Sequence, residues 1–207
     1  MAGGWEAPTV TSLSRAPVAW SETALFEYLR HGYGAQHGRA SGPMAPVVQQ
    51  LAQRPETDVR AMATYLASVD ERRNGASAEG LPRGDAEAAA RLVAQSNTPG
   101  AAPLHDRLRR LPPRRQRPAA ALGHNIALAL NSNLHSERPD NLLRVILEGI
   151  REPATNDIGF MPAFRNHLDD AQLGQLAAYM RQRFAPHKPA WQGLKAQAGH
   201  LRAIPPH

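Results

Sequence analysis

The chain contains no cysteine, and this absence narrows its chemistry more than any other feature of its composition. With 0 Cys among 207 residues, disulfides and thiolate metal sites are excluded. No apolar run approaches the roughly 20 residues that a membrane-spanning helix needs. Residues 1–20 also lack the basic start and the apolar core of a signal peptide. From the sequence we expect neither a transmembrane segment nor a signal peptide.

Motifs for catalysis are also missing. The sequence has no Gly-x-Ser-x-Gly, no phosphate-binding loop and no dinucleotide fingerprint. Asp169 and Asp170 are adjacent carboxylates, but they stand where a helix is predicted to begin, which is a capping position. We therefore expect no catalytic residue and no enzyme activity in this chain.

The positive charge of the chain is concentrated in one stretch. The net charge is +6, and the stretch from Ala101 to Ala120 supplies +5 of it, because six arginines there face one acid, Asp106. This stretch has no interleaved aromatic residues for base stacking. Its Arg/Pro-rich text has no amphipathic period, which is typical of irregular, solvated chain. We therefore interpret the stretch as solvated chain without a specific role. Binding of nucleic acid by these arginines is the weakest of the functional hypotheses. The arginines are Arg107, Arg109, Arg110, Arg114, Arg115 and Arg117.

The apolar residues recur at helical spacing, and no strand pattern extends beyond a few residues, so the fold class predicted is all-α. One helix is expected between a Ser21 cap and Gly32, and residues 31–46 are expected to be loop. Further helices are predicted over 59–69 and 85–95, from an Asp140 cap to Gly149, and from an Asp169 cap onward. A short final helix is predicted from the spacing of Trp191, Leu194, Ala198 and Leu201.

Two stretches of the chain share one layout, and repeats of this kind indicate repeated architecture. Each has a helix ending in glycine, a loop that presents a methionine, and a second helix containing tyrosine. Gly32 and Met44 are 12 residues apart, and so are Gly149 and Met161. In each stretch a further glycine, Gly42 or Gly159, precedes the methionine by two residues.

These phrases resemble a known family. Gly42-Pro43-Met44, Leu143–Gly149 and Met161-Pro162-Ala163-Phe164, in this order and spacing, are similar to the multi-haem cytochrome c subunits of periplasmic dehydrogenases. These subunits serve alcohol and gluconate dehydrogenases and molybdenum hydroxylases of the nicotinate dehydrogenase type. The tail Lys188-Pro189-Ala190-Trp191 looks like the molybdenum-hydroxylase subset.

The resemblance implies a function in electron transfer rather than catalysis. It implies covalent haem c as cofactor, a dehydrogenase catalytic subunit and a respiratory-chain acceptor as partners, and a location in the periplasm or on the periplasmic face of the inner membrane. It assigns Met44 and Met161 as distal axial ligands of two haem irons, since a thioether favours the ferrous state. The glycine two residues earlier would let the backbone pass close to the macrocycle.

The chain departs from this family at the haem attachment site. Covalent attachment requires Cys-x-x-Cys-His, and with no Cys it cannot occur here. The first repeat begins too near residue 1 to include the half of the domain that carries this motif, so we interpret the repeat as truncated. The second repeat is long enough to include that half, but an irregular insert stands where the motif is expected. The expected division is a loose segment 1–19, the back half of a cytochrome c-like domain 20–70, a linker 71–84, a near-complete domain 85–185 with the insert 96–123, and a tail helix 186–207.

The insert has a testable explanation. Codons can be chosen for Leu108–Arg117 that read Cys-Ala-Ala-Cys-His when shifted by one base. We hypothesise that residues 96–123 are translated out of frame, which the nucleotide sequence of the locus decides.

Several alternatives stay open at this stage. Met44 and Met161 can be plain loop or core methionines, and the chain a haem-free helical binding or scaffold protein. Tyr65, Tyr179, Phe26 and Leu143 are assigned to the core. Each histidine is by default structural or on the surface, and a replacement proximal ligand is a minor alternative. The histidines weighed are His31, His37, His105, His124, His135 and His167, with His105 and His124 nearest the right region.

Overall fold

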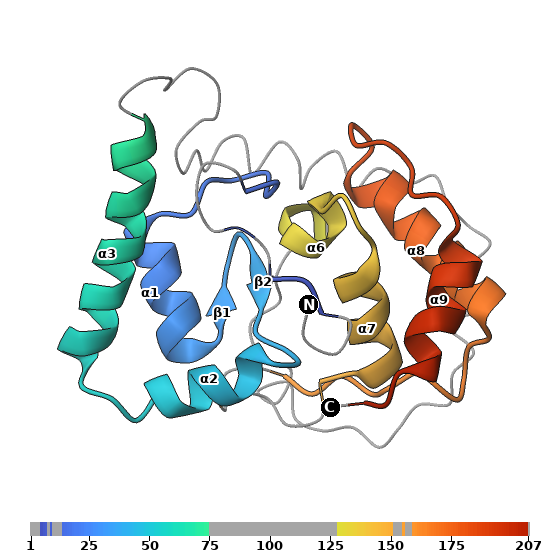
Figure 1. The fold of residues 1–207 in the computed structure, drawn as a ribbon, viewed down its shortest axis with the longest axis horizontal. Helices are drawn as coiled ribbons and strands as arrows, with labels where there is room; N and C mark the ends of the chain where they lie inside the picture. Colours follow the sequence, from blue (N-terminus) through green and yellow to red (C-terminus); the bar gives the residue numbers. More distant parts are fainter. Residues whose placement is uncertain are drawn as a thin grey trace.

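Two groups of helices lie on either side of a short β-hairpin (Figure 1). The computed structural model describes residues 5–7, 9, 14–74, 128–150, 155 and 159–206, with only the backbone for 70–74. The predicted helix 85–95, the insert 96–123 and residues 75–84 of the predicted linker lie outside these residues. The elements are α1 (Glu22–His31), β1 (Tyr33–Gly34), β2 (Gly38–Arg39), α2 (Met44–Leu51), α3 (Glu56–Asn74), the 3-10 helix η2 (Leu128–Leu130), α6 (Ser132–His135), α7 (Asp140–Glu148), α8 (Asp170–Phe184) and α9 (Leu194–Ala203).

The first group forms because α1 and α3 bury complementary apolar faces. Leu25 and Phe26 of α1 pack with Val59 and Ala63 of α3, and all four are buried. The hydroxyl of Ser21 accepts a hydrogen bond from the Ala24 amide at 3.1 Å, as predicted for an N-cap. At the other end Gly32 adopts φ 80°, and its amide donates to the Tyr28 carbonyl. Both predicted boundaries of α1 are therefore confirmed.

The second group encloses the larger apolar cluster. Its buried members come from α6, α7, α8 and α9 and include Leu134, Leu143, Leu173 and Leu201. Helix α9 approaches α8 closely at Gly174, where a β-carbon would lie 3.2 Å from the β-carbon of Leu194. The predicted N-cap Asp169 is confirmed, since its carboxylate accepts from the Gln172 amide at 2.8 Å in a full capping box.

Three sequence predictions are wrong in detail. Residues 31–46 are not all loop: β1 pairs antiparallel with β2, and α2 begins at Met44 behind Pro43, whose φ of −59° suits a helix start. Asp140 is not an N-cap, because Pro139 takes that position and the Asp140 carboxylate is buried in side-chain contacts. Tyr65 is not core, because 63% of it is exposed on α3, whereas Phe26 and Leu143 are buried as predicted.

The two groups are joined by the hairpin and by the N-terminal segment. The Ser132 amide of α6 donates to the His37 carbonyl at 2.7 Å, beside the hairpin that lies between the groups in Figure 1. The side-chain amide of Asn141 on α7 exchanges two hydrogen bonds with the Glu6 backbone, at 2.9 and 2.8 Å. Among the described helices, none has the length and apolar character to cross a membrane.

Candidate functional site

Met44 stands at the start of α2, directly after the hairpin. Its side chain is half-buried and packs against a small apolar cluster made of Ala40, Val48 and Ile150. We call these three residues the bridging cluster, because Ala40 and Val48 belong to the first half of the chain and Ile150 to the second. The structure therefore places this thioether at the contact between the two halves.

Met161 reaches the same cluster from the other half of the chain. Its amide donates to the Ile150 carbonyl at 3.0 Å and its carbonyl accepts from the Ile150 amide at 2.9 Å. Its side chain is half-buried and packs against both the bridging cluster and the large cluster around α7 and α8. The two methionines singled out by the repeat thus contact one common cluster.

The equal spacing of the two methionines conceals different backbone surroundings. Ile150, the residue after Gly149, pairs with Met161 itself. Tyr33, the residue after Gly32, pairs with Arg39, so Met44 follows its hairpin rather than forming part of it. Both helix ends use a glycine at positive φ, 80° for Gly32 and 71° for Gly149. The structural equivalence of Met44 and Met161 within repeated domains stays a prediction.

An indole fills the space beside Gly42. This glycine has φ +53°, and a β-carbon on it would lie 2.5 Å from two ring atoms of Trp5. Trp5 is buried, and its indole N–H has no hydrogen-bond partner. Because Gly42 has no side chain, Trp5 can pack directly against its backbone. The family resemblance implies that the haem macrocycle makes this close contact instead.

Among the histidines that the structure describes, two are buried, and the sequence does not single them out. His37 is 2% exposed, stacks on Trp20 with ring centres 3.7 Å apart, and has no partner for either ring nitrogen. His135 is 1% exposed, and its Nε2 lies 2.8 Å from the Ala129 carbonyl oxygen. The only feature of the sequence that points to the burial of His37 is its place beside a glycine-rich stretch. Of the other histidines weighed, His31 and His167 are partly or fully exposed, and His105 and His124 lie outside the described residues.

Burial determines the protonation of these groups. It lowers the pKa of His37 to about 4 and that of His135 to about 4, so both imidazoles are neutral near pH 7. Burial likewise raises the pKa of Tyr28, which packs against the bridging cluster, to about 12. Of these three groups, only Tyr28 packs against the bridging cluster, and its phenol is neutral there.

The residues present fit one part of a haem c site and not the other. Thioether coordination fits, because Met44 and Met161 are half-buried sulfur donors in apolar surroundings. Covalent attachment does not fit, because the whole sequence has 0 Cys. Within the described ranges, moreover, no group of three or more His, Cys, Asp or Glu side chains is placed to hold a metal ion. A polar hollow of about 200 Å³ lies away from the methionines, between the N-terminal segment and α6–α7, lined in part by Ser14, Arg15, Ser132 and Asn141.

Comparison with known proteins finds relatives along most of the chain. The sequence is 44% identical over 205 residues, 99% of this chain, to a nicotinate dehydrogenase subunit of Pseudomonas putida. It is 28% identical over 200 residues, 88% of the chain, to the fructose dehydrogenase cytochrome subunit of Gluconobacter japonicus. It is also 28% identical over 210 residues, 91% of the chain, to the cytochrome c subunit of the quinone alcohol dehydrogenase of Gluconobacter oxydans.

The chain is a relative of the cytochrome c subunits of dehydrogenases. This confirms the resemblance drawn from the glycine–methionine phrases, and the largely helical structure agrees with it. The chain spans 17% of the nicotinate dehydrogenase subunit and 41% of each of the other two relatives. No protein-family model matches the chain.

Proposed function

We propose that this chain serves electron transfer as part of a cytochrome subunit that docks on a dehydrogenase catalytic subunit. The observation that carries the proposal is the pair of half-buried thioethers, Met44 and Met161, in a chain related along 88–91% of its length to cytochrome subunits of dehydrogenases. In this proposal each methionine is a distal axial ligand. The partners are the dehydrogenase and a respiratory-chain acceptor, and the location is the periplasm or the periplasmic face of the inner membrane.

Haem, when bound, supplies a one-electron couple between ferric and ferrous iron. The contribution of this chain is the donor set and the surroundings. A thioether favours the ferrous form and raises the potential, and apolar surroundings act in the same direction because they disfavour the extra charge of the ferric site. Since the chain lacks thiols, haem on it would be held by coordination and packing alone.

A second function is supported by a separate observation. The bridging cluster packs both methionines against Ala40, Val48 and Ile150, and Trp5 closes the space beside Gly42. Methionines used in this way join the two halves of the chain without any cofactor. A haem-free helical scaffold that docks on the same kind of partner would keep these contacts and bind no haem.

Electrochemistry separates the two functions. Purified protein is mixed with one and two equivalents of haemin, freed of excess, and examined by voltammetry. The electron-transfer proposal predicts retained haem and a reversible one-electron wave at a potential above that of free haemin. Protein that retains no haem after gel filtration, yet still associates with a dehydrogenase catalytic subunit, would support the scaffold instead.

A further inference from the structure

An imidazole lone pair without a partner lies beside a second imidazole in the second group of helices. His135 ends α6, and His187 follows α8. Their ring centres are 5.4 Å apart, and the rings are tilted by 32°. His135 is 1% exposed, whereas His187 is exposed and open to solvent.

The tautomer of His135 follows from its hydrogen bond. Its Nε2 lies 2.8 Å from the Ala129 carbonyl oxygen, and a carbonyl only accepts, so Nε2 carries the proton. In the neutral ring Nδ1 then presents a lone pair. That atom is buried and has no hydrogen-bond partner, which costs free energy unless a donor or a metal ion meets it.

This arrangement is the one that metal-binding histidines use. Such a histidine donates its other ring N–H to a carbonyl or carboxylate, which fixes the ring and leaves the second nitrogen free to coordinate. With metal–nitrogen bonds of about 2.0–2.1 Å and a tetrahedral angle, the centres of two coordinated imidazoles lie about 5 Å apart. The observed separation of 5.4 Å is close to that value.

We propose that Nδ1 of His135 and the ring of His187 form a two-imidazole site for a late first-row divalent metal ion, with water completing the coordination. Imidazole suits zinc, copper and nickel. Desolvation and the nearby cations Lys188 and Arg181 lower the pKa of each histidine, and both shifts favour the neutral form that coordinates metal.

The same cations limit the affinity of the site. Arg181 is occupied elsewhere: its guanidinium donates to the carbonyls of Leu134, Ser136 and Pro189 and stacks on Trp191. Arg181 keeps its charge in these contacts, so Lys188 is the one of the two cations that can be replaced without removing them. Its replacement by a neutral residue should therefore tighten metal binding, which distinguishes a true site from scattered surface histidines.

Cu²⁺ is the probe, because it binds nitrogen sites most strongly in its series and its paramagnetic resonance reports coordinated nitrogens. Protein stripped with chelator should bind one Cu²⁺ with nitrogen hyperfine structure from two imidazoles. His187→Gln, at an exposed position, should weaken binding at least tenfold and remove one nitrogen. The matched control His200→Gln, on an exposed face of α9, should leave both unchanged, and Lys188→Gln should strengthen binding.

Two results would overturn the site. One is Cu²⁺ binding to His187→Gln with wild-type affinity and spectrum. The other is a hydrogen bond from the His187 N–H to Nδ1 of His135, detected by nitrogen NMR in the wild-type protein, that persists when an equimolar amount of diamagnetic Zn²⁺ is added. The outcome is independent of haem, because neither Met44 nor Met161 takes part.

Discussion

The indole of Trp5 lies against Gly42, so close that a β-carbon there would be 2.5 Å from two of its ring atoms. Gly42 also adopts φ +53°, a conformation that L side chains rarely take. The contact holds the N-terminal segment onto the Gly42-Pro43-Met44 turn, and so fixes the backbone that presents Met44.

Gly42→Ala should destabilise the protein by about 2–4 kcal/mol, because it combines a steric clash with an unfavourable φ. Urea unfolding followed by circular dichroism measures the change. Gly193→Ala is the matched control: Gly193 has φ +66° but nothing within 4 Å of the added β-carbon. It should cost only the conformational part, about 1 kcal/mol. Equal losses for the two variants would show that Trp5 does not pack as described.

The buried histidines predict a loss of stability in acid. The pKa of His37 is lowered from 6.5 to about 4 in the folded protein, so between these values the unfolded chain takes up a proton that the folded chain does not. The contribution of His37 to the free energy of unfolding is therefore fully present above pH 6.5 and is lost as the pH drops toward 4. The loss for this one group is on the order of 3 kcal/mol. Unfolding midpoints measured in urea at a series of pH values test this.

His37→Phe keeps the stacking on Trp20 and removes the titrating group. We expect its stability to depend less steeply on pH between 6.5 and 4 than that of the wild type, while His135 continues to contribute because its pKa is also lowered to about 4. A pH dependence unchanged by this substitution would mean that His37 is accessible to protons in the folded state.

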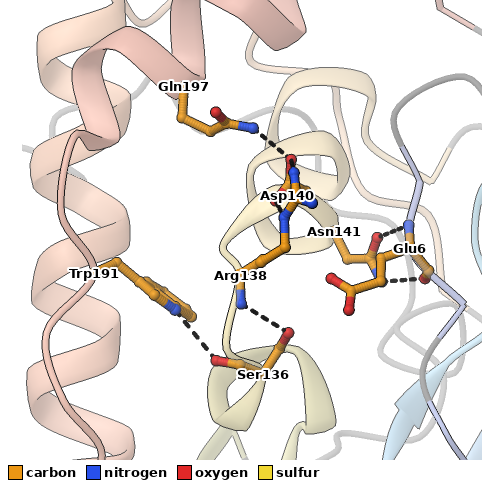
Figure 2. A network of polar contacts seen from close by, with 7 residues as sticks. All are labelled: Glu6, Ser136, Arg138, Asp140, Asn141, Trp191 and Gln197. Atoms are coloured by element: carbon orange, nitrogen blue, oxygen red, sulfur yellow. Dashed lines mark hydrogen bonds and ion pairs between the residues drawn. The ribbon is translucent and has the colours of Figure 1, made fainter. Parts of the chain in front are cut away.

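Asp140 ties α7 to α9 and to its own flanking turn (Figure 2). Its side chain is 4% exposed and accepts from the Arg138 guanidinium at 2.9 Å and from the Gln197 amide at 2.5 Å. Asp140→Ala should cost about 2–3 kcal/mol in urea unfolding, because the amide of Gln197 and the guanidinium of Arg138 lose a charged acceptor. Asp169→Ala, which removes only an exposed cap, should cost about 1 kcal/mol. Comparable losses would contradict the structural role of Asp140.

Contacts within one helix end can be predicted from the sequence, whereas contacts between distant helices, such as those of Asp140, cannot. The caps Ser21 and Asp169 were predictable because capping depends on residues three positions apart. The role of Asp140 was not, because its partner Gln197 comes from a distant helix. Helix α2 was missed because the glycines and prolines around it outweighed its short apolar pattern, and Tyr65 was assigned to the core although no described element covers that side of α3.

For the candidate site, the sequence predicts two residues but not their arrangement in space, and the role of these residues stays a prediction. The spacing of glycine and methionine identified Met44 and Met161, and the relatives confirm the family that this spacing indicated. Their convergence on one cluster depends on Ile150 pairing with Met161, 11 residues further along the chain. Such pairing is tertiary information, which periodicity does not carry.

The locus itself gives an independent test of the missing attachment site. If residues 96–123 are translated out of frame, the DNA of that stretch read in a shifted frame should encode Cys-x-x-Cys-His near Leu108–Arg117. Sequencing across the region decides this. A stretch of DNA that encodes no such motif in any register would show that the frame hypothesis is wrong.

The coordination of iron by Met44 and Met161 is tested most directly by absorption spectroscopy of the haemin-loaded protein. Our account predicts a sharp Soret band and the weak far-red band of ferric iron bound to a thioether. Met44→Leu and Met161→Leu should each lower the far-red band by about half, and the double variant should abolish it while circular dichroism stays unchanged. A far-red band that persists in the double variant, or wild-type protein that takes up no haemin, would contradict the account.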